Sequence, residues 1–164
     1  MAAFDFPDLA KAMRDAAREG KLGDQFRELL NQHGTADIAF GSLSLLGFLV
    51  GNSAPLEDCR LALENGASES DWKRDQRIPE MHLAALNADP LYVELLLDHG
   101  FSVTSLDIDG NTPLHAAIQD QKIDVANVLL VRGADPDLKN SRGESPRDLA
   151  TIYGVSGVEF DKAS

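Results

Sequence analysis

Four histidines come first among the residues that could do chemistry, because histidine titrates near neutral pH and is the commonest metal ligand. His82 and His115 each stand two residues before an alanine, whereas His33 and His99 each precede a glycine, where an imidazole can meet the last free carbonyls of a helix. No motif places a nucleophile beside any of them, and no glycine-rich loop with a lysine is present to cradle a phosphate. We interpret all four as structural residues, and the sequence predicts no catalytic site.

A second candidate is the acidic run Asp107–Gly110, because a calcium loop places acids at alternate positions before a glycine. With Gly110 as the sixth position, Ser105 is the first and Ala116 the twelfth, so the bidentate glutamate is missing. We expect these acids to be solvated at a loop tip or to contact a basic partner, and we predict neither a metal nor another cofactor. A metal-dependent accessory protein or weak hydrolase that uses the acidic cluster is the alternative from a different class.

Cys59 and Trp72 each occur once in the chain. A single cysteine excludes an intramolecular disulfide and a zinc site built from cysteine pairs. Cys59 lies in the apolar run Leu56–Leu63, so we interpret it as a small core residue. Trp72 stands in the polar segment 68–77. Two interpretations of Trp72 are equally supported: it packs back on neighbouring helices, or it anchors a partner, as tryptophan often does at interfaces.

The composition predicts one acidic, folded domain. The 164 residues include 27 Asp and Glu against 15 Lys and Arg, a formal charge of -12 with a pI near 4.6, and 43% are hydrophobic. Phosphate backbones and anionic lipid repel such a chain, so neither nucleic acid nor a membrane is expected as the primary partner. Asp5 and Asp8 interrupt the region where a secretory signal needs an apolar run, and the longest apolar stretch, 43–50, is far shorter than the ~20 residues of a spanning helix. These features predict a cytoplasmic protein.

A repeat organises the second half of the chain. His82 and His115 are 33 residues apart, and the same distance separates Gly100 from Gly133 and Gly110 from Gly143. A fixed period of this size indicates a repeat architecture. Within one period, Thr112 can cap a helix that Pro113 begins. A second apolar helix from Ile123 ends at Gly133, a natural C-terminal cap. Each unit is therefore predicted to consist of a turn, two short helices and a loop.

The run 110–117, Gly-Asn-Thr-Pro-Leu-His-Ala-Ala, resembles the signature of the ankyrin repeat family. The copy from Ile78 keeps the histidine but has Pro79-Glu80 where Thr-Pro is usual, and the copy from Glu144 keeps Ser-Pro. The resemblance implies an all-α solenoid of helix-turn-helix units with projecting loops or short hairpins, in which each histidine bonds the threonine hydroxyl and the loop backbone between units. It implies a single domain over 1–164 with approximate units at 5–34, 41–67, 78–100, 111–133 and 144–164, and a first helix over 41–50 in the second of these. The residues expected to hold the frame are His82, Gly110, Thr112, Pro113, Leu114, His115, Gly133 and Gly143.

The candidates for partner binding are the positions that the repeat pattern does not fix and that differ between the repeat copies. In the family that the chain resembles they line one concave face, which here is expected to be acidic and partly aromatic. The set comprises Asp71, Trp72, Asp75, Leu86, Asn87, Asp107, Asp109, Asn111, Gln119, Asp120, Lys139, Ser141, Glu144, Ile152 and Tyr153. We therefore predict a non-catalytic protein-binding module that is monomeric when free and docks a folded, basic protein. An inhibitor or immunity-type neutralising protein is the sharper version of this prediction, and a general adaptor or regulatory subunit is its alternative.

Overall fold

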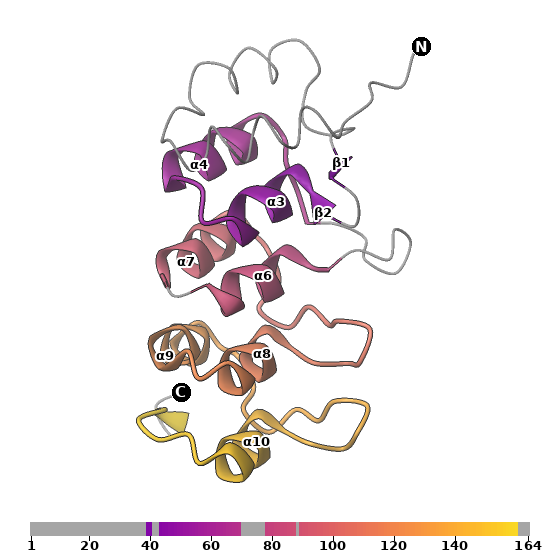
Figure 1. The fold of residues 1–164 in the computed structure, drawn as a ribbon, viewed down its shortest axis with the longest axis vertical. Helices are drawn as coiled ribbons and strands as arrows, with labels where there is room; N and C mark the ends of the chain where they lie inside the picture. Colours follow the sequence, from indigo (N-terminus) through magenta and orange to yellow (C-terminus); the bar gives the residue numbers. More distant parts are fainter. Residues whose placement is uncertain (1–38, 41–42, 70–77, 88, 161–164) are drawn as a thin grey trace. The chain divides into compact units, whose positions relative to one another are not determined.

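The computed structural model describes residues 39–40, 43–69, 78–87 and 89–160. They fall into two compact units that meet in the sequence between Ser68 and Glu69, and Figure 1 shows the elements of each. The fold is helical, as the resemblance to ankyrin repeats predicts. The β-structure of the described ranges is one hairpin with two residues in each strand. The unit predicted at 5–34, with His33, lies outside the described residues.

The first unit contains a short hairpin and one helix pair. Its elements are β1 (Ala39–Phe40), β2 (Leu43–Ser44), α3 (Leu45–Gly51) and α4 (Leu56–Glu64), and the two strands pair antiparallel. The helix expected over 41–50 begins only at Leu45, because the Ser44 hydroxyl accepts the Gly47 N–H at 2.9 Å and caps the helix there. Every residue from Leu45 to Val50 is buried, so α3 forms the core of this unit with the buried side of α4.

The second unit stacks three repeats. Its helices are α6 (Glu80–Leu86), α7 (Leu91–Asp98), α8 (Pro113–Gln119), α9 (Ile123–Val131) and α10 (Pro146–Tyr153). The inner helices α6, α8 and α10 pack side by side, α6 and α8 also pack against the outer helices α7 and α9, and α7 contacts α9. The segments 103–111 and 136–144 extend to one side of the stack (Figure 1) and are called the loop edge below.

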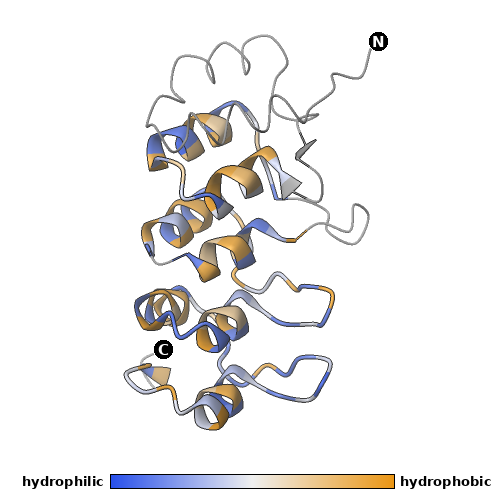
Figure 2. Ribbon diagram, viewed as in Figure 1, coloured by the Kyte–Doolittle hydropathy of each residue, from blue (hydrophilic) through white to orange (hydrophobic). Residues whose placement is uncertain are grey.

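Small residues let neighbouring inner helices of this unit approach each other. Ala84, Ala85 and Ala117 are wholly buried where α6 and α8 pack together. Leu96 of α7 and Leu129 of α9 are wholly buried as well, so the outer helices close the other side of the core. Figure 2 shows apolar residues concentrated in the helices, whereas the loop edge is mostly polar.

The described chain after α10 does not form a second helix. Gly154 has a positive φ of 65° and ends α10. Asn127 of α9 then holds the terminal segment: its Nδ2 donates to the Gly157 carbonyl at 3.2 Å, and its Oδ1 accepts the Glu159 N–H at 2.8 Å. The segment 154–160 therefore contacts α9 directly, in place of a third outer helix.

Candidate functional site

The start of α8 shows how one repeat is tied to the next. Thr112 caps the helix that Pro113 begins, and its N–H donates to His115 Nδ1 at 3.0 Å. His115 Nε2 lies 3.0 Å from the carbonyl of Glu144, in the following loop. Because a carbonyl only accepts, Nε2 carries the proton and Nδ1 is the acceptor. Burial lowers the pKa of His115 and keeps the ring neutral, and the adjacent Leu114 is wholly buried.

His82 repeats only half of this arrangement. Its Nε2 lies 2.8 Å from the Asn111 carbonyl, which is the equivalent contact between repeats. The ring is buried, yet Nδ1 has no hydrogen-bond partner among the described residues. Pro79 occupies the cap position of α6 that Thr112 occupies in α8, and proline has neither a hydroxyl nor an N–H to donate. The departure from the repeat pattern at Pro79 therefore leaves a buried acceptor unsatisfied.

Each turn of the loop edge is closed by one short polar side chain. Asp107 Oδ1 accepts the N–H groups of Asp109 at 2.9 Å and of Asn111 at 2.8 Å. Asn140, at the equivalent position of the next repeat, closes its turn with the same pair of bonds to the second and fourth residues after it. The two turns thus share one backbone design, and the side chains at their tips are free to differ.

Two of the predicted binding residues belong to this frame. Asn111 is buried, its Nδ2 donates to Asp107 Oδ2 at 3.0 Å, and its Oδ1 accepts Asn140 Nδ2 at 2.9 Å. The prediction that Asn111 faces a partner is therefore wrong, because both polar atoms of its side chain are bonded inside the loop edge. Asp107 is half-buried, and its carboxylate closes the turn instead of lying in solvent as a charge for a basic partner.

The inner helices end in a row of side chains at equivalent repeat positions. This inner row comprises Leu86, Asn87, Gln119, Asp120, Ile152 and Tyr153. Leu86 is 44% exposed, Ile152 63% and Tyr153 51%. Because α6, α8 and α10 pack side by side, the constant spacing of the repeats brings these positions into one row. The structure thus groups six of the predicted binding residues, with exposed apolar side chains at both ends of the row.

Charge on the inner row and the loop edge is largely compensated. Asp120 pairs with Lys122 at 3.3 Å, and Glu144, which is half-buried, pairs with Arg142 at 3.1 Å. Asp109 is exposed and forms no ion pair within the described residues. Exposed Lys139 and Ser141 complete the predicted positions of the loop edge. Three of the four predicted acids in this part of the molecule are thus paired with a cation or used in a turn, and Asp109 alone among them has an exposed carboxylate without an ion pair in the described residues.

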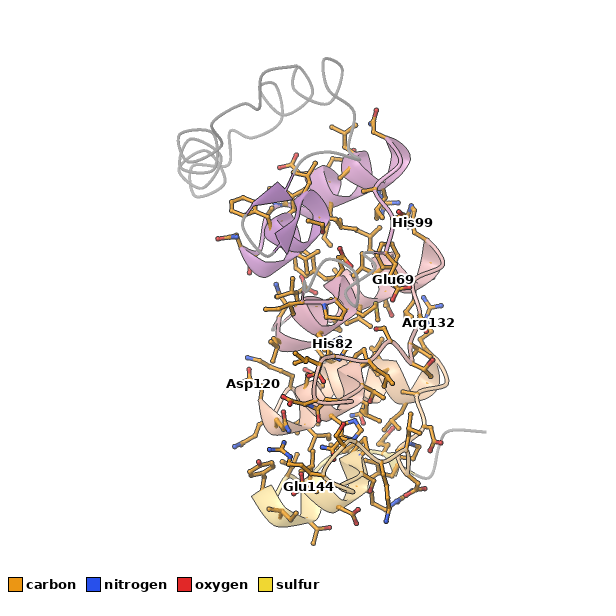
Figure 3. The ribbon with its side chains drawn as sticks, turned by 90° about the vertical axis from the view of Figure 1, so that its right-hand side faces the viewer. Glu69, His82, His99, Asp120, Arg132 and Glu144 are labelled. Carbon is orange, nitrogen blue, oxygen red and sulfur yellow. The ribbon has the colours of Figure 1, made fainter. Side chains whose placement is uncertain are left out.

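Several carboxylates of the second unit lie on or beside its outer helices. Those on or beside the outer helices are Asp89, Glu94, Asp98, Asp124, Asp135 and Asp137. Within the described residues, arginines pair with two of them, Arg132 with Asp98 and Arg147 with Asp137. Arg132 and His99 lie on the opposite side of the stack from Asp120 in Figure 3. The other four carboxylates form no ion pair within the described residues.

The remaining candidates divide between described and undescribed parts of the chain. His99 Nδ1 lies 2.8 Å from the Leu95 carbonyl at the end of α7, the helix-end contact that the sequence predicts. Gly110, Gly133 and Gly143 all have positive φ. Asp71, Trp72 and Asp75 lie outside the described residues.

Cys59 has the environment of a core residue. It is wholly buried in α4, and burial raises the pKa of its thiol to about 12, with the Asp58 charge acting in the same direction. The thiol therefore stays protonated at neutral pH. In the ranges that the structure describes, no three His, Cys, Asp or Glu side chains are grouped as metal ligands would be. None of the described helices has the length and apolarity to span a membrane.

Comparison with known proteins identifies the repeat. The family described as Ankyrin repeats (many copies) matches residues 96–150. The chain is 38% identical over 75 residues to the ADP-ribosylation factor GTPase-activating protein AGD2 of Arabidopsis thaliana, a match that covers 46% of this chain and 10% of that protein. It is 36% identical over 95 residues to the human 2-5A-dependent ribonuclease, covering 56% of this chain and 13% of the ribonuclease. It is 39% identical over 69 residues to the mouse protein phosphatase 1 regulatory subunit 27, covering 42% of this chain and 45% of the subunit.

Fold, frame and comparisons agree on one class, a helical array built from repeated helix pairs. Residues 96–150 of the chain are ankyrin repeats. These repeats are a protein–protein interaction module, of a family that is generally non-catalytic. The chain spans less than half the length of each of the three relatives.

Proposed function

We propose that this chain is a non-catalytic module that binds one folded protein through the inner row and the loop edge. The exposed apolar side chains of the inner row carry the proposal. The middle repeat is built with Gln119 at the position that Leu86 and Ile152 occupy in its neighbours, so folding does not require an apolar residue there. Burying each of these side chains against a partner contributes ~1.5–3 kcal/mol.

The proposed partner is basic. The formal charge of the chain is -12, and four carboxylates on or beside the outer helices of the second unit, Asp89, Glu94, Asp124 and Asp135, form no ion pair within the described residues. A field of this sign speeds the encounter with a basic protein whichever face makes the final contact. The inner row and the loop edge, where charge is compensated, then provide the short-range fit. A monomeric, cytoplasmic inhibitor or immunity-type protein that neutralises a basic partner is the sharper form of this proposal.

An adaptor or regulatory subunit is the second candidate. The relative named protein phosphatase 1 regulatory subunit 27 favours it, since the match covers a larger share of that relative than of the other two. The two candidates differ in what the chain does to its partner. An inhibitor abolishes the partner's own activity at a one-to-one ratio, whereas an adaptor leaves that activity intact and changes which third molecule the partner meets.

Affinity capture with the full chain from an extract of its own cells, at low and at moderate salt, tests the proposal. The partner is then purified and its Kd is measured for wild type, for the pair Ile152→Ser with Tyr153→Ala, and for Val131→Ser. Val131 is the matched control because it is 73% exposed on outer helix α9. We expect the inner-row pair to weaken binding at least tenfold, about 1.4 kcal/mol, and the control to bind like wild type. Equal affinity of all three proteins contradicts the proposed face.

Trp72 gives a separate prediction that rests on the sequence alone. If it fills a pocket on the partner, Trp72→Ala weakens binding by at least ~2 kcal/mol and leaves folding nearly untouched. A variant that unfolds while its folded fraction binds normally assigns Trp72 to the core instead.

Metal-dependent chemistry, the alternative from a different class, is tested by thermal unfolding. Calcium, magnesium or zinc that binds the folded chain alone raises its Tm by mass action. We expect no shift with any of the three ions. A rise of many degrees overturns the proposal of a purely protein-binding module.

A further inference from the structure

Ile108, at the tip of the loop edge, is an exposed apolar side chain that the fold itself does not explain. It is 84% exposed, the largest exposed fraction among the large apolar side chains of the described residues. On one side stands Asp107, whose carboxylate is committed to the turn, and on the other stands exposed Asp109. A single exposed apolar residue is ordinary on a protein surface. What distinguishes Ile108 is the backbone that carries it.

The backbone around Ile108 is held from both sides. The Asp107 N–H donates to the Asn111 carbonyl at 3.0 Å, the Gly110 N–H donates to the Asp107 carbonyl at 3.1 Å, and the Asp109 carbonyl accepts the Ser141 N–H of the next loop at 3.0 Å. Gly110 has a φ of +73°, and a Cβ there would stand 2.8 Å from a side-chain atom of the next loop. The tip is therefore fixed before any partner arrives, so a partner that buries Ile108 does not have to order this backbone.

The next loop shows that the turn does not need isoleucine. Ser141 occupies, one repeat later, the position that Ile108 occupies here, and Asn140 closes that turn with the same bonds that Asp107 makes. Serine at the tip thus supports the same backbone design. Folding gains nothing from an aliphatic side chain that remains in water at position 108, whereas a partner that covers it gains the free energy of its burial.

We infer that Ile108 is the apolar anchor with which the loop edge enters a pocket on a protein partner. The pocket is lined by apolar side chains and bordered by a lysine or arginine that meets the Asp109 carboxylate, which forms no ion pair within the described part of the chain. This inference rests on the proposed function and names the chemistry of its contact. A basic protein fits best, because the unpaired Asp109 carboxylate beside the tip and the formal charge of -12 disfavour anionic lipid and a second copy of this chain.

The test uses the full chain and the purified protein that the wild-type chain captures from an extract of its own cells. Ile108→Ser gives the first tip the residue that the chain itself carries at the second, so the fold is preserved, and Val131→Ser, at an exposed position of outer helix α9, is the matched control. Ile108→Leu keeps an aliphatic group of the same size. We expect Ile108→Ser to weaken the Kd about 30-fold, which is about 2 kcal/mol at 1.4 kcal/mol per tenfold. Ile108→Leu and Val131→Ser should stay within a factor of about three of wild type, and all variants should keep the wild-type Tm.

The possible outcomes separate this inference from the proposed function. Capture of a partner alone says nothing about Ile108, because the test of the anchor is the Kd of Ile108→Ser relative to that of wild type. A partner that binds Ile108→Ser as tightly as wild type, but loses affinity for the inner-row pair, overturns the anchor and leaves the proposed function standing. Binding of wild type to anionic vesicles or to itself, with loss in Ile108→Ser, overturns the protein pocket. If wild type captures no protein, the proposed function fails and the anchor fails with it.

Discussion

Replacing Pro79 by threonine tests whether the repeat frame accounts for the unsatisfied nitrogen of His82. The backbone of Pro79 has φ -60° and ψ 139°, close to the φ -87° and ψ 167° of Thr112 at the same position of the next repeat. Threonine therefore fits position 79 with little adjustment. It adds an N–H and a hydroxyl, both of which reach Nδ1 of the histidine in the intact cap of α8, at 3.0 and 2.8 Å.

Three contributions decide the size of the effect. A buried acceptor without a partner costs ~1–3 kcal/mol, and a missing N-terminal cap costs about 1 kcal/mol. Loss of proline acts in the opposite direction, because the unfolded chain regains conformational freedom worth ~0.4–1 kcal/mol. We therefore expect Pro79→Thr to raise the free energy of unfolding by ~1–3.5 kcal/mol.

Urea unfolding of the full chain provides the measurement. Pro79→Ala is the matched control, because alanine restores the N–H without the hydroxyl, and it should gain less than threonine. The gain from Pro79→Thr should vanish when His82 is replaced by alanine in a double-mutant cycle. The ¹⁵N chemical shift of His82 Nδ1 should also show a new hydrogen bond. A threonine variant that is no more stable than wild type, or a gain that persists without His82, refutes the assignment of the unsatisfied nitrogen to Pro79.

Three further predictions follow from the same frame. Thr112→Ala should lower the free energy of unfolding by ~1–2 kcal/mol in urea titrations without altering partner affinity per folded molecule, and an unchanged stability would dismiss its capping role. Asp107→Ala should lower the free energy of unfolding by ~1–3 kcal/mol, because its carboxylate closes the turn. Asp109→Ala should change that free energy by no more than ~0.5 kcal/mol and should instead slow association with the partner at low salt. The reverse pattern would contradict the roles assigned to the two acids. Burial lowers the pKa of both His82 and His115, so below about pH 6.5 the unfolded chain takes up protons that the folded chain does not. Stability should therefore be lower at pH 5.5 than at pH 7.5 in urea titrations, and a rise toward acid would exclude this linkage.

Much of the helical frame is predictable because its signals are local. Thr112 and Ser145 stand directly before a proline and cap α8 and α10, each with the side chain of the third helical residue bonded back to the cap. The start of α3 is also local, since Ser44 caps it, but the expectation of a helix from residue 41 missed that signal because the apolar run extends past the cap. A serine before a run of apolar residues at helical spacing is the feature that locates such a start.

Contacts between repeats are not predictable from local signals, because they depend on atoms that belong to the next repeat. In the sequence, Asn111 has the features of an exposed loop residue. The structure shows that Asn140 of the next loop, 29 residues later, donates a hydrogen bond to its side-chain oxygen. Likewise, the charges of the chain are plain in its composition, but which of them are compensated depends on the cations that packing brings near. Arg132, for example, pairs with Asp98, 34 residues earlier in the chain, because α9 packs against α7.

The sequence by itself determines that this protein is a repeated helix pair with an acidic surface, because period, caps and charge are properties of neighbouring residues or of the whole composition. Tertiary structure decides which polar groups are hydrogen-bonded within and between the repeats, and which apolar side chains remain exposed to solvent. Pro79 illustrates both levels: the sequence shows that it departs from the pattern, and only the packed array shows that the departure leaves His82 Nδ1 without a donor. The physical reason is that hydrogen bonds and burial are satisfied by whatever lies adjacent in space, and in a stacked array that neighbour comes from the next repeat.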